Sequence, residues 1–470
     1  MCTATDNDYE ESVQCMEEKP SHNLVGALCK KCGNNKAEVV LRVKDTYCRQ
    51  CFIDSFTHKF RATLGKSKML KPNDKIILAV SGSPSSLAML QLVKDGIEIT
   101  TPKRLQCIPC IVYVDEGAVL GHTYEQRQEI CISMAKITKK YGIPGFITSL
   151  DRCLDISSSH SKLCEELHES MVWHVNEERE LRLQSLFAQL KSLSSKEDLL
   201  LKLRHKLLFS VAEELDCSKI FVGDCATDLA VSIMANLSLG RGAQLPYDVG
   251  FCDYRHGKTK LLRPMRDFMK KEIAFYMVFK NIGSVSYPTL SSKVDPFSSI
   301  QRLTEKFITE LQKDFPSTVS TIFRTGDKLT SEGTRNVECK TCLLCEAPLD
   351  TSKQDSSSMQ ATEFSQLISS PMFADVKDLL THSSSDLHSN AVSSMGDSNC
   401  CTSNYQCTCI SQNQLQKLDF EQIKENLCYG CRLIVKEMDS LDFLPGDITS
   451  SVKTEIMQKQ LRKEIQDFLL

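Results

Sequence analysis

Residues 75–86 read KIILAVSGSPSS, and this stretch decides the fold. The apolar run Lys75–Ser81 predicts a buried strand, and Leu87, Leu90 and Val93 follow at the spacing of a helix. A strand that turns through small residues into a helix points backbone N–H groups and a positive helix end at an anion. An ordinary turn capped by serine accounts for the same residues, so the stretch alone leaves both interpretations open.

Strands and helices continue to alternate after this stretch. Further strands are expected at Ile108–Asp115, Phe146–Leu150, Ile220–Gly223 and Lys260–Leu262. Helices are expected at Thr123–Tyr141, Leu199–Leu215 and Asp228–Leu239, and over 301–313. Strands joined by single helices imply right-handed crossovers, and they predict an α/β protein with a parallel, doubly wound sheet.

Length and composition set the outer limits. A chain of 470 residues exceeds what one hydrophobic core usually holds, so two or three domains are expected. The net charge of −3 argues against a strongly basic nucleic-acid binder, but it leaves room for a local basic patch or a basic partner. No apolar run reaches the roughly 18 residues of a membrane helix, and the acidic N-terminus is unlike a signal or transit peptide. These features predict a cytoplasmic protein without membrane contact.

Changes in composition divide the chain into parts. We expect a disordered leader at 1–22, an N-terminal cysteine unit with its helix at 23–66, the α/β domain at 67–335, a C-terminal cysteine unit at 336–448 and a terminal helix at 449–470. Residues 157–196 are rich in glutamate and predict a helical insertion in the α/β domain. Residues 351–412 are rich in serine and aspartate, and they predict a disordered insertion in the C-terminal unit.

Two CxxC pairs stand near the N-terminus. Fifteen residues separate Cys29 and Cys32 from Cys48 and Cys51, which is the spacing of two knuckles around one tetrahedral zinc ion with a short hairpin between them. A unit this small lacks a core of its own, so metal binding would supply most of its folding free energy. A redox dithiol pair or free structural thiols are the alternative.

A second zinc site is expected in the C-terminal unit. We pair Cys342 and Cys345 with Cys428 and Cys431 as a ribbon that the insertion at 351–412 interrupts. The other cysteines of this region are Cys339, a spare or alternate ligand, and Cys400, Cys401, Cys407 and Cys409, which we favour as free thiols over a third site.

Cys107 and Cys110 also form a CxxC, but it runs into a predicted strand. Side chains three residues apart on a strand point to opposite faces of the sheet. Both are therefore expected to be buried structural cysteines.

The loop Ser81–Ser86 resembles the SGGxDS signature of the PP-loop ATP pyrophosphatases, which adenylate a substrate carbonyl and release pyrophosphate. Val114–Gly117 stands where adenosine lies in that family, and residues 223–242 resemble its GHxxDDxAET…N…RG segment. The match covers roughly residues 70–290. It implies a sheet of the PP-loop, adenine-nucleotide-alpha-hydrolase-like type. The nucleotide site that it implies comprises Ser81, Gly82, Ser86, Asp115 and Asp228.

With both sets of cysteines, the chain is similar to a branch of this family that thiolates tRNA. In that branch a non-catalytic subunit pairs with a catalytic PP-loop subunit. Sulfur from a thiocarboxylated ubiquitin-related modifier reaches the wobble uridine of tRNAs for Lys, Glu and Gln. The resemblance therefore implies three partners, namely the catalytic subunit of a heterodimer, tRNA and the ubiquitin-related sulfur carrier.

Departures from the family pattern argue against catalysis by this chain. Ser83 replaces the second glycine of the signature, Pro84 removes one N–H donor, and Ser85 replaces an aspartate suited to organising Mg²⁺. Catalytic relatives carry a CxxC before the helix that begins near Leu199, where this chain reads Ser194–Asp198 without a thiol. We therefore assign no catalytic residue, and we leave ATP binding open.

Five cations are candidates for contact with RNA. They are Arg204, Lys206, Arg241, Arg263 and Arg266. Isolated charges are more often solvated or ion-paired than bound to RNA. Their expected place near the carboxyl ends of parallel strands, where ligands bind in such sheets, favours the RNA interpretation.

Three hypotheses for the function follow. The first is a non-catalytic subunit that positions tRNA or the catalytic partner in a heteromeric tRNA thiolase. The second is an ATP-using tRNA-modifying enzyme with an eroded loop. The third is a zinc-held interaction adaptor that keeps the PP-loop fold only as structure. The missing CxxC and the SGSPSS loop favour the first hypothesis over the second, and the retained Ser81, Gly82, Ser86 and Asp228 weigh against the third.

Overall fold

The computed structural model describes most of the chain. The described residues are 27–41, 45–100, 104–156, 162–285, 287–290, 292, 294–329, 340–349 and 418–466. The predicted leader at 1–22 and the predicted insertion at 351–412 lie outside them. Among the helices of these residues, none combines the length and the apolar character that crossing a bilayer requires.

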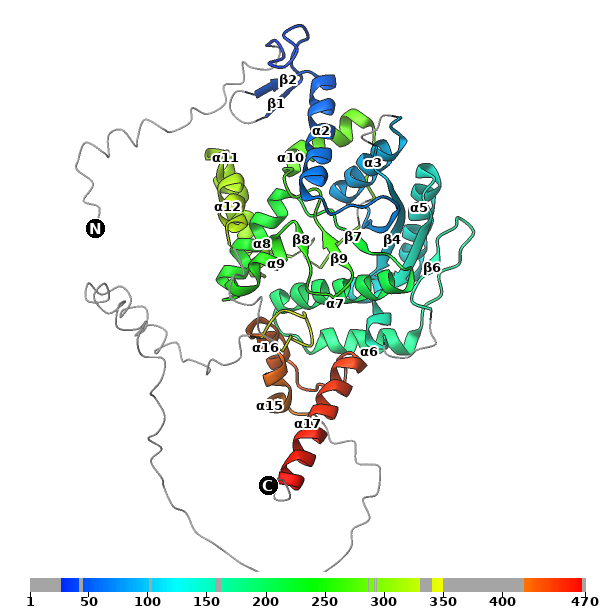
Figure 1. The fold of residues 1–470 in the computed structure, drawn as a ribbon, viewed down its shortest axis with the longest axis vertical. Coiled ribbons are helices and arrows are strands. Elements are labelled where there is room, and N and C mark those ends of the chain that lie inside the picture. The colour runs from blue at the N-terminus through cyan, green and yellow to red at the C-terminus, as the bar shows by residue number, and fades with distance from the viewer. Residues whose placement is uncertain are drawn as a thin grey trace, which may run out of the picture. The chain divides into compact units, whose positions relative to one another are not determined.

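A seven-stranded sheet with the order β6-β5-β4-β3-β7-β9-β8 forms the centre of the molecule (Figure 1). Its parallel strands are β3 (Asp74–Ala79), β4 (Cys107–Asp115), β5 (Gly145–Ser149), β7 (Lys219–Phe221) and β9 (Lys260–Leu262). They are the five strands that the sequence predicts. Two short edge strands, β6 (Glu165–Glu166) and β8 (Cys252–Asp253), pair antiparallel and were not predicted. A two-residue strand has no periodicity to detect.

The chain enters the sheet at β3, in its middle. It adds β4 and β5 on one side and then returns past β3 to add β7 and β9 on the other. Ligands of such sheets bind outside the carboxyl ends of the strands where the order reverses. The loop Ser81–Ser86, which follows β3, lies at this switch point.

Helices cover both faces of the sheet. They are α3 (Pro84–Glu98), α5 (Tyr124–Tyr141), α6 (Glu177–Ala188), α7 (Leu193–Glu214) and α10 (Lys270–Lys280), while α8 (Ala226–Ser238) follows β7 and packs into separate apolar clusters. Ile77 of β3 packs into one core with α6 and α7, whereas Ile76 and Leu78 pack into another with α3, α5 and α10. In Figure 1, α7 accordingly lies across the sheet from α3. The predicted doubly wound arrangement is confirmed.

Cys107 and Cys110 show the same alternation along β4. Cys107 is buried in the core beside α3, and Cys110 is buried in the core beside α7, where its Sγ lies 3.9 Å from the Sγ of Cys217. This confirms the expectation of buried cysteines on opposite faces.

Within the predicted helical insertion at 157–196, the described residues form β6, α6 and the start of α7. Trp173 from this segment is fully buried in the core beside α5. The segment therefore completes the core and also adds an edge strand to the sheet.

The N-terminal unit consists of the hairpin β1 (Val39–Leu41) and β2 (Asp45–Tyr47), followed by α2 (Arg49–Ser67). Aromatic side chains on one side of α2 hold it against α10. The Phe56 ring stacks on that of Tyr276 with 4.3 Å between centroids, and Phe52 meets Phe279 edge to face.

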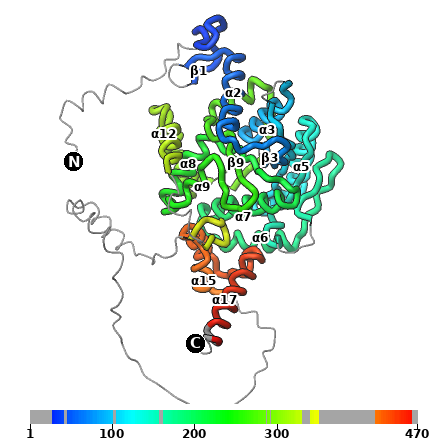
Figure 2. Tube along the Cα trace, in the orientation of Figure 1, coloured from blue at the N-terminus to red at the C-terminus, as the bar shows by residue number. Residues whose placement is uncertain are grey.

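The C-terminal elements complete the structure. They are α15 (Phe420–Ile423), α16 (Tyr429–Lys436) and α17 (Gly446–Gln466), and Figure 2 shows them on the side of the sheet where α6 and α7 lie. Ile448 and Val452 of α17 pack into the core that contains α7. In sequence, α11 (Ile300–Asp314) and α12 (Thr318–Asp327) follow the strands of the sheet and precede these C-terminal elements. Both helices pack on α8.

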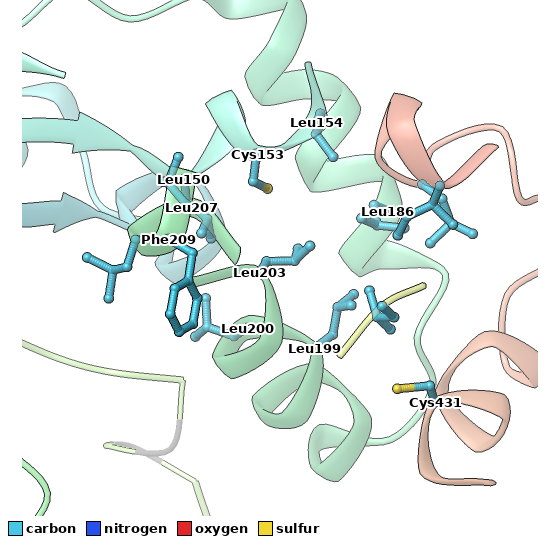
Figure 3. Close-up of a cluster of buried hydrophobic side chains, with 14 of the residues drawn as sticks. Leu150, Cys153, Leu154, Leu186, Leu199, Leu200, Leu203, Leu207, Phe209 and Cys431 are labelled. Carbon is cyan, nitrogen blue, oxygen red and sulfur yellow. The ribbon is translucent and has the colours of Figure 1, made fainter. Parts of the chain in front are cut away.

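The substitution Leu203→Ala tests the packing of α7. Leu203 is fully buried among the side chains shown in Figure 3. Its truncation is expected to lower the free energy of unfolding by about 2–5 kcal/mol, measured by chemical denaturation. Leu201 on the same helix is 41% exposed, so Leu201→Ala is a matched control that should change this free energy by less than about 0.5 kcal/mol. Equal losses in the two variants would contradict the described orientation of α7.

Candidate functional site

The loop between β3 and α3 satisfies many of its own hydrogen-bonding groups. The Ser83 Oγ accepts a hydrogen bond from the Ser86 N–H at 3.4 Å and lies 3.1 Å from the Ser81 Oγ. The Ser86 hydroxyl donates to the Ser83 carbonyl at 2.9 Å, and Pro84 begins α3 without an N–H. Some of the hydrogen-bonding groups that a phosphate-binding loop offers to its anion are therefore occupied by hydrogen bonds within this loop.

Two glycines allow the surrounding backbone to approach this loop closely. Gly82 has φ +81°, and a Cβ there would lie 2.7 Å from the carbonyl oxygen of Val285. The Val285 N–H donates to the Gly82 carbonyl at 3.1 Å, so the segment after α10 is fastened to the loop. A Cβ on Gly223, after β7, would lie 2.9 Å from the Ser86 nitrogen. A side chain at either glycine would push neighbouring backbone away from the loop.

Asp115, at the carboxyl end of β4, is bound by groups of the chain itself. One carboxylate oxygen accepts from the Arg127 guanidinium at 2.9 and 2.6 Å and from the Trp173 indole N–H at 2.7 Å. The other accepts from the Gly117 N–H at 2.9 Å, and the side chain is 2% exposed. The structure thus places Asp115 at the predicted position, but in a buried ion pair.

Asp228 lies at the start of α8. It accepts a hydrogen bond from the Cys225 N–H at 3.3 Å and pairs with Lys270 at 2.9 Å. Nearby Asp224 pairs with Arg263 at 3.2 Å. Burial raises the pKa of the Asp224 carboxyl, and the positive charge of Arg263 opposes the rise.

Each of the five cations that are candidates for RNA contact forms an ion pair within the chain. The pairs are Arg204 with Glu116, Lys206 with Asp447, Arg241 with Asp198, Arg263 with Asp224, and Arg266 with Asp327. Arg263 is also bound to the carbonyls of Tyr247 and Gly250 and is 1% exposed. RNA contact by these residues stays a prediction, and it would require carboxylates to give up their partners.

The first cysteine cluster joins Cys29, Cys32, Cys48 and Cys51, as the spacing predicts. Their sulfur atoms lie within 4.8 Å of one another, with 4.0 Å between those of Cys32 and Cys48. Burial alone would raise the pKa of the Cys29 thiol, but hydrogen bonds from the backbone of Cys48, Cys32 and Lys31 lower it to about 6. The thiolate is the form that binds metal, so this cluster is suited to a metal ion.

The second cluster joins Cys342, Cys345, Cys428 and Cys431 across the insertion. Their sulfur atoms also lie within 4.8 Å of one another, and those of Cys345 and Cys428 are 3.6 Å apart. A tetrahedral ion with metal–sulfur bonds of about 2.3 Å separates its sulfur ligands by about 3.8 Å, so the geometry fits. Cys339 and the four cysteines at 400–409 lie outside the described residues.

Positive side chains balance the charge of this second cluster. Burial alone would lower the pKa of the Lys202 ammonium, but the charges of Asp198 and of the Cys431 and Cys345 thiolates raise it. Burial alone would also lower the pKa of the Arg255 guanidinium, but the negative charges of Asp248, Asp253 and Cys345 raise it. The proximity of Lys202 and Arg255 to the cysteines could not be predicted from the sequence, because Cys345 and Cys431 are far from them in the chain.

The N-terminus of α7, where the family resemblance implies a CxxC in catalytic relatives, contains serines in this chain. Glu437, which follows α16, accepts hydrogen bonds there from the Lys191 and Ser192 N–H groups at 2.9 and 3.0 Å. It also accepts from the hydroxyls of Ser192 and Ser195 at 2.9 and 2.7 Å. The Ser194 hydroxyl accepts from the first N–H of α11 at 2.9 Å. The α7 N-terminus is therefore a joint between the α/β domain and the C-terminal elements.

A cavity of about 220 Å³ lies between α7, α8 and the second cysteine cluster. Asp228, Arg263 and Lys206 line it, together with His205 and Cys345. Burial and the charges of Arg263 and Arg204 lower the pKa of His205 well below its usual value, so its imidazole is neutral at pH 7. Charged and apolar side chains both line the cavity, and most of its acidic and basic groups are paired with neighbours.

The reversal of strand order at β3 and the Ser/Gly loop before α3 define a PP-loop-like α/β protein of the adenine-nucleotide-hydrolase-like class. A solved relative of this fold is the U34-tRNA thiolase NcsA from Methanococcus maripaludis with its [4Fe-4S] cluster. The TM-score is 0.50 and the identity 22%, over 67% of this chain and 91% of that chain, which establishes likeness of fold alone.

Sequence comparisons give the family. A family model described as cytoplasmic tRNA 2-thiolation protein 2 matches residues 299–433. Proteins of that name are 36% identical in Danio rerio, over 100% of this chain and 99% of that protein, and 35% identical in Xenopus tropicalis, over 98% of each. The human one is 33% identical over 94% of this chain and 93% of its own. The chain belongs to the cytoplasmic tRNA 2-thiolation protein 2 family, as its motifs predict.

The metal content of the purified chain tests the two cysteine clusters. We expect about two metal ions per chain by elemental analysis, because each cluster supplies four thiolates. Cys48→Ser should lose one ion and unfold the N-terminal hairpin. Cys107→Ser is the matched control, since Cys107 is buried outside both clusters. A Cys48→Ser protein that keeps both ions would contradict the first site.

The substitution Glu437→Gln tests the joint at α7. Burial alone would raise the pKa of Glu437 above its ordinary value of 4.5, but the hydrogen bonds from residues 191–195 lower it. A carboxyl with a lowered pKa in the folded state stabilises above its unfolded pKa and loses that effect as pH falls through the folded value. Glu437→Gln should therefore lower the free energy of unfolding by about 1–3 kcal/mol at pH 7 and by less below pH about 4.

The exposed Glu213, on α7, provides the control variant Glu213→Gln. It should leave the free energy of unfolding within about 0.5 kcal/mol of the wild type at both pH values. A Glu437→Gln effect that is the same at pH 7 and pH 4 would show that the carboxylate charge is not what stabilises the joint.

Proposed function

We propose that this chain is the non-catalytic subunit of a cytoplasmic tRNA thiolase that 2-thiolates the wobble uridine of tRNAs for Lys, Glu and Gln. It pairs with a catalytic PP-loop subunit, which receives sulfur from a thiocarboxylated ubiquitin-related modifier. This chain positions the tRNA or the partner. The observation that carries the proposal is the α7 N-terminus, where Ser192 and Ser195 bind Glu437 instead of providing thiols.

The state of the phosphate loop supports the same assignment. Adenylation requires N–H donors and a metal to stabilise the charge of the departing pyrophosphate. In this chain Pro84 removes a donor, and Ser83 caps the Ser86 N–H. Removal of one well-placed donor typically costs a factor of about 10²–10³ in rate. These losses favour a supporting role over an ATP-using enzyme.

We assign zinc to both cysteine clusters. Four thiolates close the tetrahedral shell of a zinc ion and leave no position for substrate, which is typical of structural sites. The first cluster lies in a short segment with little core of its own, where bound metal adds directly to folding free energy, whereas the second cluster lies in the core that contains α7. In this proposal the ions hold the N-terminal hairpin and the C-terminal elements in place.

Mass spectrometry of tRNA nucleosides tests the proposal in cells. Cells without this chain should lose 2-thiouridine from the tRNAs for Lys, Glu and Gln, and the wild-type chain should restore it. The double variant Ser81→Ala, Ser85→Ala should restore it equally, because a supporting subunit does not need loop hydroxyls to bind phosphate. The comparison variant is Leu203→Ala, which should restore less because the fold is weakened.

Two outcomes would overturn the proposal in different ways. Unchanged 2-thiouridine in cells without the chain would exclude both tRNA hypotheses and favour the interaction adaptor. A loss of 10²-fold or more in thiolation with the Ser81→Ala, Ser85→Ala variant would place ATP chemistry in this chain.

A further inference from the structure

Basic residues are concentrated at the N-terminal end of the α/β domain and before it. Residues 27–71 contain eleven Lys and Arg against three Asp and Glu, a formal charge of +8 in a chain whose total is −3. Four thiolates around a divalent ion subtract two from that value. The segment therefore stays strongly basic, while the rest of the chain is acidic.

Three of these lysines belong to one short turn. Gly33 N–H donates to the Cys29 carbonyl at 2.8 Å, and Cys29 N–H donates to the Asn35 carbonyl at 2.8 Å. Gly33 has φ +68° with open space around it, as a tight exposed turn requires. Lys30, Lys31 and Lys36 belong to this turn, which we call the lysine knuckle (Cys29–Lys36).

The charges of the lysine knuckle are largely available. Lys31 and Lys36 are exposed, and neither forms an ion pair with another described residue. Lys30 is 61% exposed and pairs with Asp45 at 2.6 Å. The cysteine cluster fixes the turn, because Cys29 and Cys32 are two of its four sulfur ligands. The lysines are thus presented on a rigid support, whereas the five candidate cations of the α/β domain are held by carboxylates.

The residues exposed on this surface are better suited to bind the phosphates of a nucleic acid than to form a protein–protein interface. Protein interfaces contain an apolar core with aromatic anchors, and Lys is depleted in them. Within the described part of 27–71, Leu28 is the one large hydrophobic side chain that is exposed. The phenylalanines of α2, including Phe52 and Phe56, turn inward. Lysines without apolar anchors are typical of contacts to a phosphate backbone, which position a nucleic acid without reading its sequence.

We propose that the lysine knuckle binds the phosphate backbone of RNA, with Lys30, Lys31 and Lys36 each contacting one phosphate. This inference rests on the proposed function for the identity of that RNA as tRNA. It places the RNA contact on the N-terminal metal-held turn and away from the cations at the carboxyl edge of the sheet.

The test is the binding of an unmodified tRNA transcript to the purified full chain across a range of salt concentrations. The triple variant Lys30→Gln, Lys31→Gln, Lys36→Gln should reduce the slope of log K against log salt by about 2–3, because each lost phosphate contact removes roughly 0.7–0.9. The matched control is Lys136→Gln, Lys139→Gln, Lys140→Gln on α5, which removes three exposed lysines and should leave the slope unchanged. Metal content confirms that the knuckle is folded in each variant.

A second variant should change the affinity for the transcript in the opposite direction. Asp45→Asn releases Lys30 from its ion pair, so affinity for the transcript should rise, with a slope no smaller than that of the wild type. Equal slopes for the knuckle variant and the wild type would overturn the inference. So would a knuckle variant that binds RNA normally but no longer copurifies with the catalytic subunit, since that result makes the knuckle a protein contact. Both outcomes leave the proposed function standing, because that depends on 2-thiouridine in cells.

Discussion

The C-terminal elements and α7 share one hydrophobic core, and this packing joins the sheet to the second cysteine cluster. Cys342, Cys428 and Cys431 are buried in the same core as Leu199, Leu203 and Ile77, so one hydrophobic core extends from the sheet to the second cysteine cluster. A metal ion bound by four thiolates in such a place would need nearby positive charge, and Lys202 and Arg255 would supply it. Glu437 then binds the first turn of α7. The N-terminus of α7, where the family resemblance implies thiols in catalytic relatives, is here a contact between α7 and the C-terminal elements.

At the predicted nucleotide site, hydrogen bonds and ion pairs within the chain likewise take the place of contacts to a ligand. Asp115 is satisfied by Arg127 and Trp173, and Asp228 by Lys270. The loop after β3 keeps the strand–turn–helix geometry, but Ser83 supplies the cap that an anion would otherwise provide. These contacts explain how a PP-loop-like fold persists without the signature residues. Polar groups at the switch point are satisfied by the chain, so the fold does not require a bound nucleotide.

The features that could be predicted from the sequence are those that local residue patterns specify. Five parallel strands followed from apolar runs bounded by turns, and both four-cysteine clusters followed from CxxC spacing, even across the insertion at 351–412. The partners of Arg241, Asp115 and Glu437 were not predictable, because Asp198, Trp173 and Ser192 are 43, 58 and 245 residues away in sequence. Charge and the expected place near the carboxyl ends of the strands made Arg204 and Arg263 candidates for RNA contact, and only the fold shows the carboxylates beside them.

In the proposed function, this chain supports chemistry that its catalytic partner carries out. The most direct test is a reconstitution of the two subunits with tRNA, ATP, Mg²⁺ and the thiocarboxylated donor, in which the phosphate loop of one subunit at a time is disabled. Pyrophosphate and 2-thiouridine are measured together. Both products should form when only this chain's loop is altered, and both should disappear when only the partner's loop is altered. Formation of both products with the partner's loop disabled would show that the chemistry takes place in this chain.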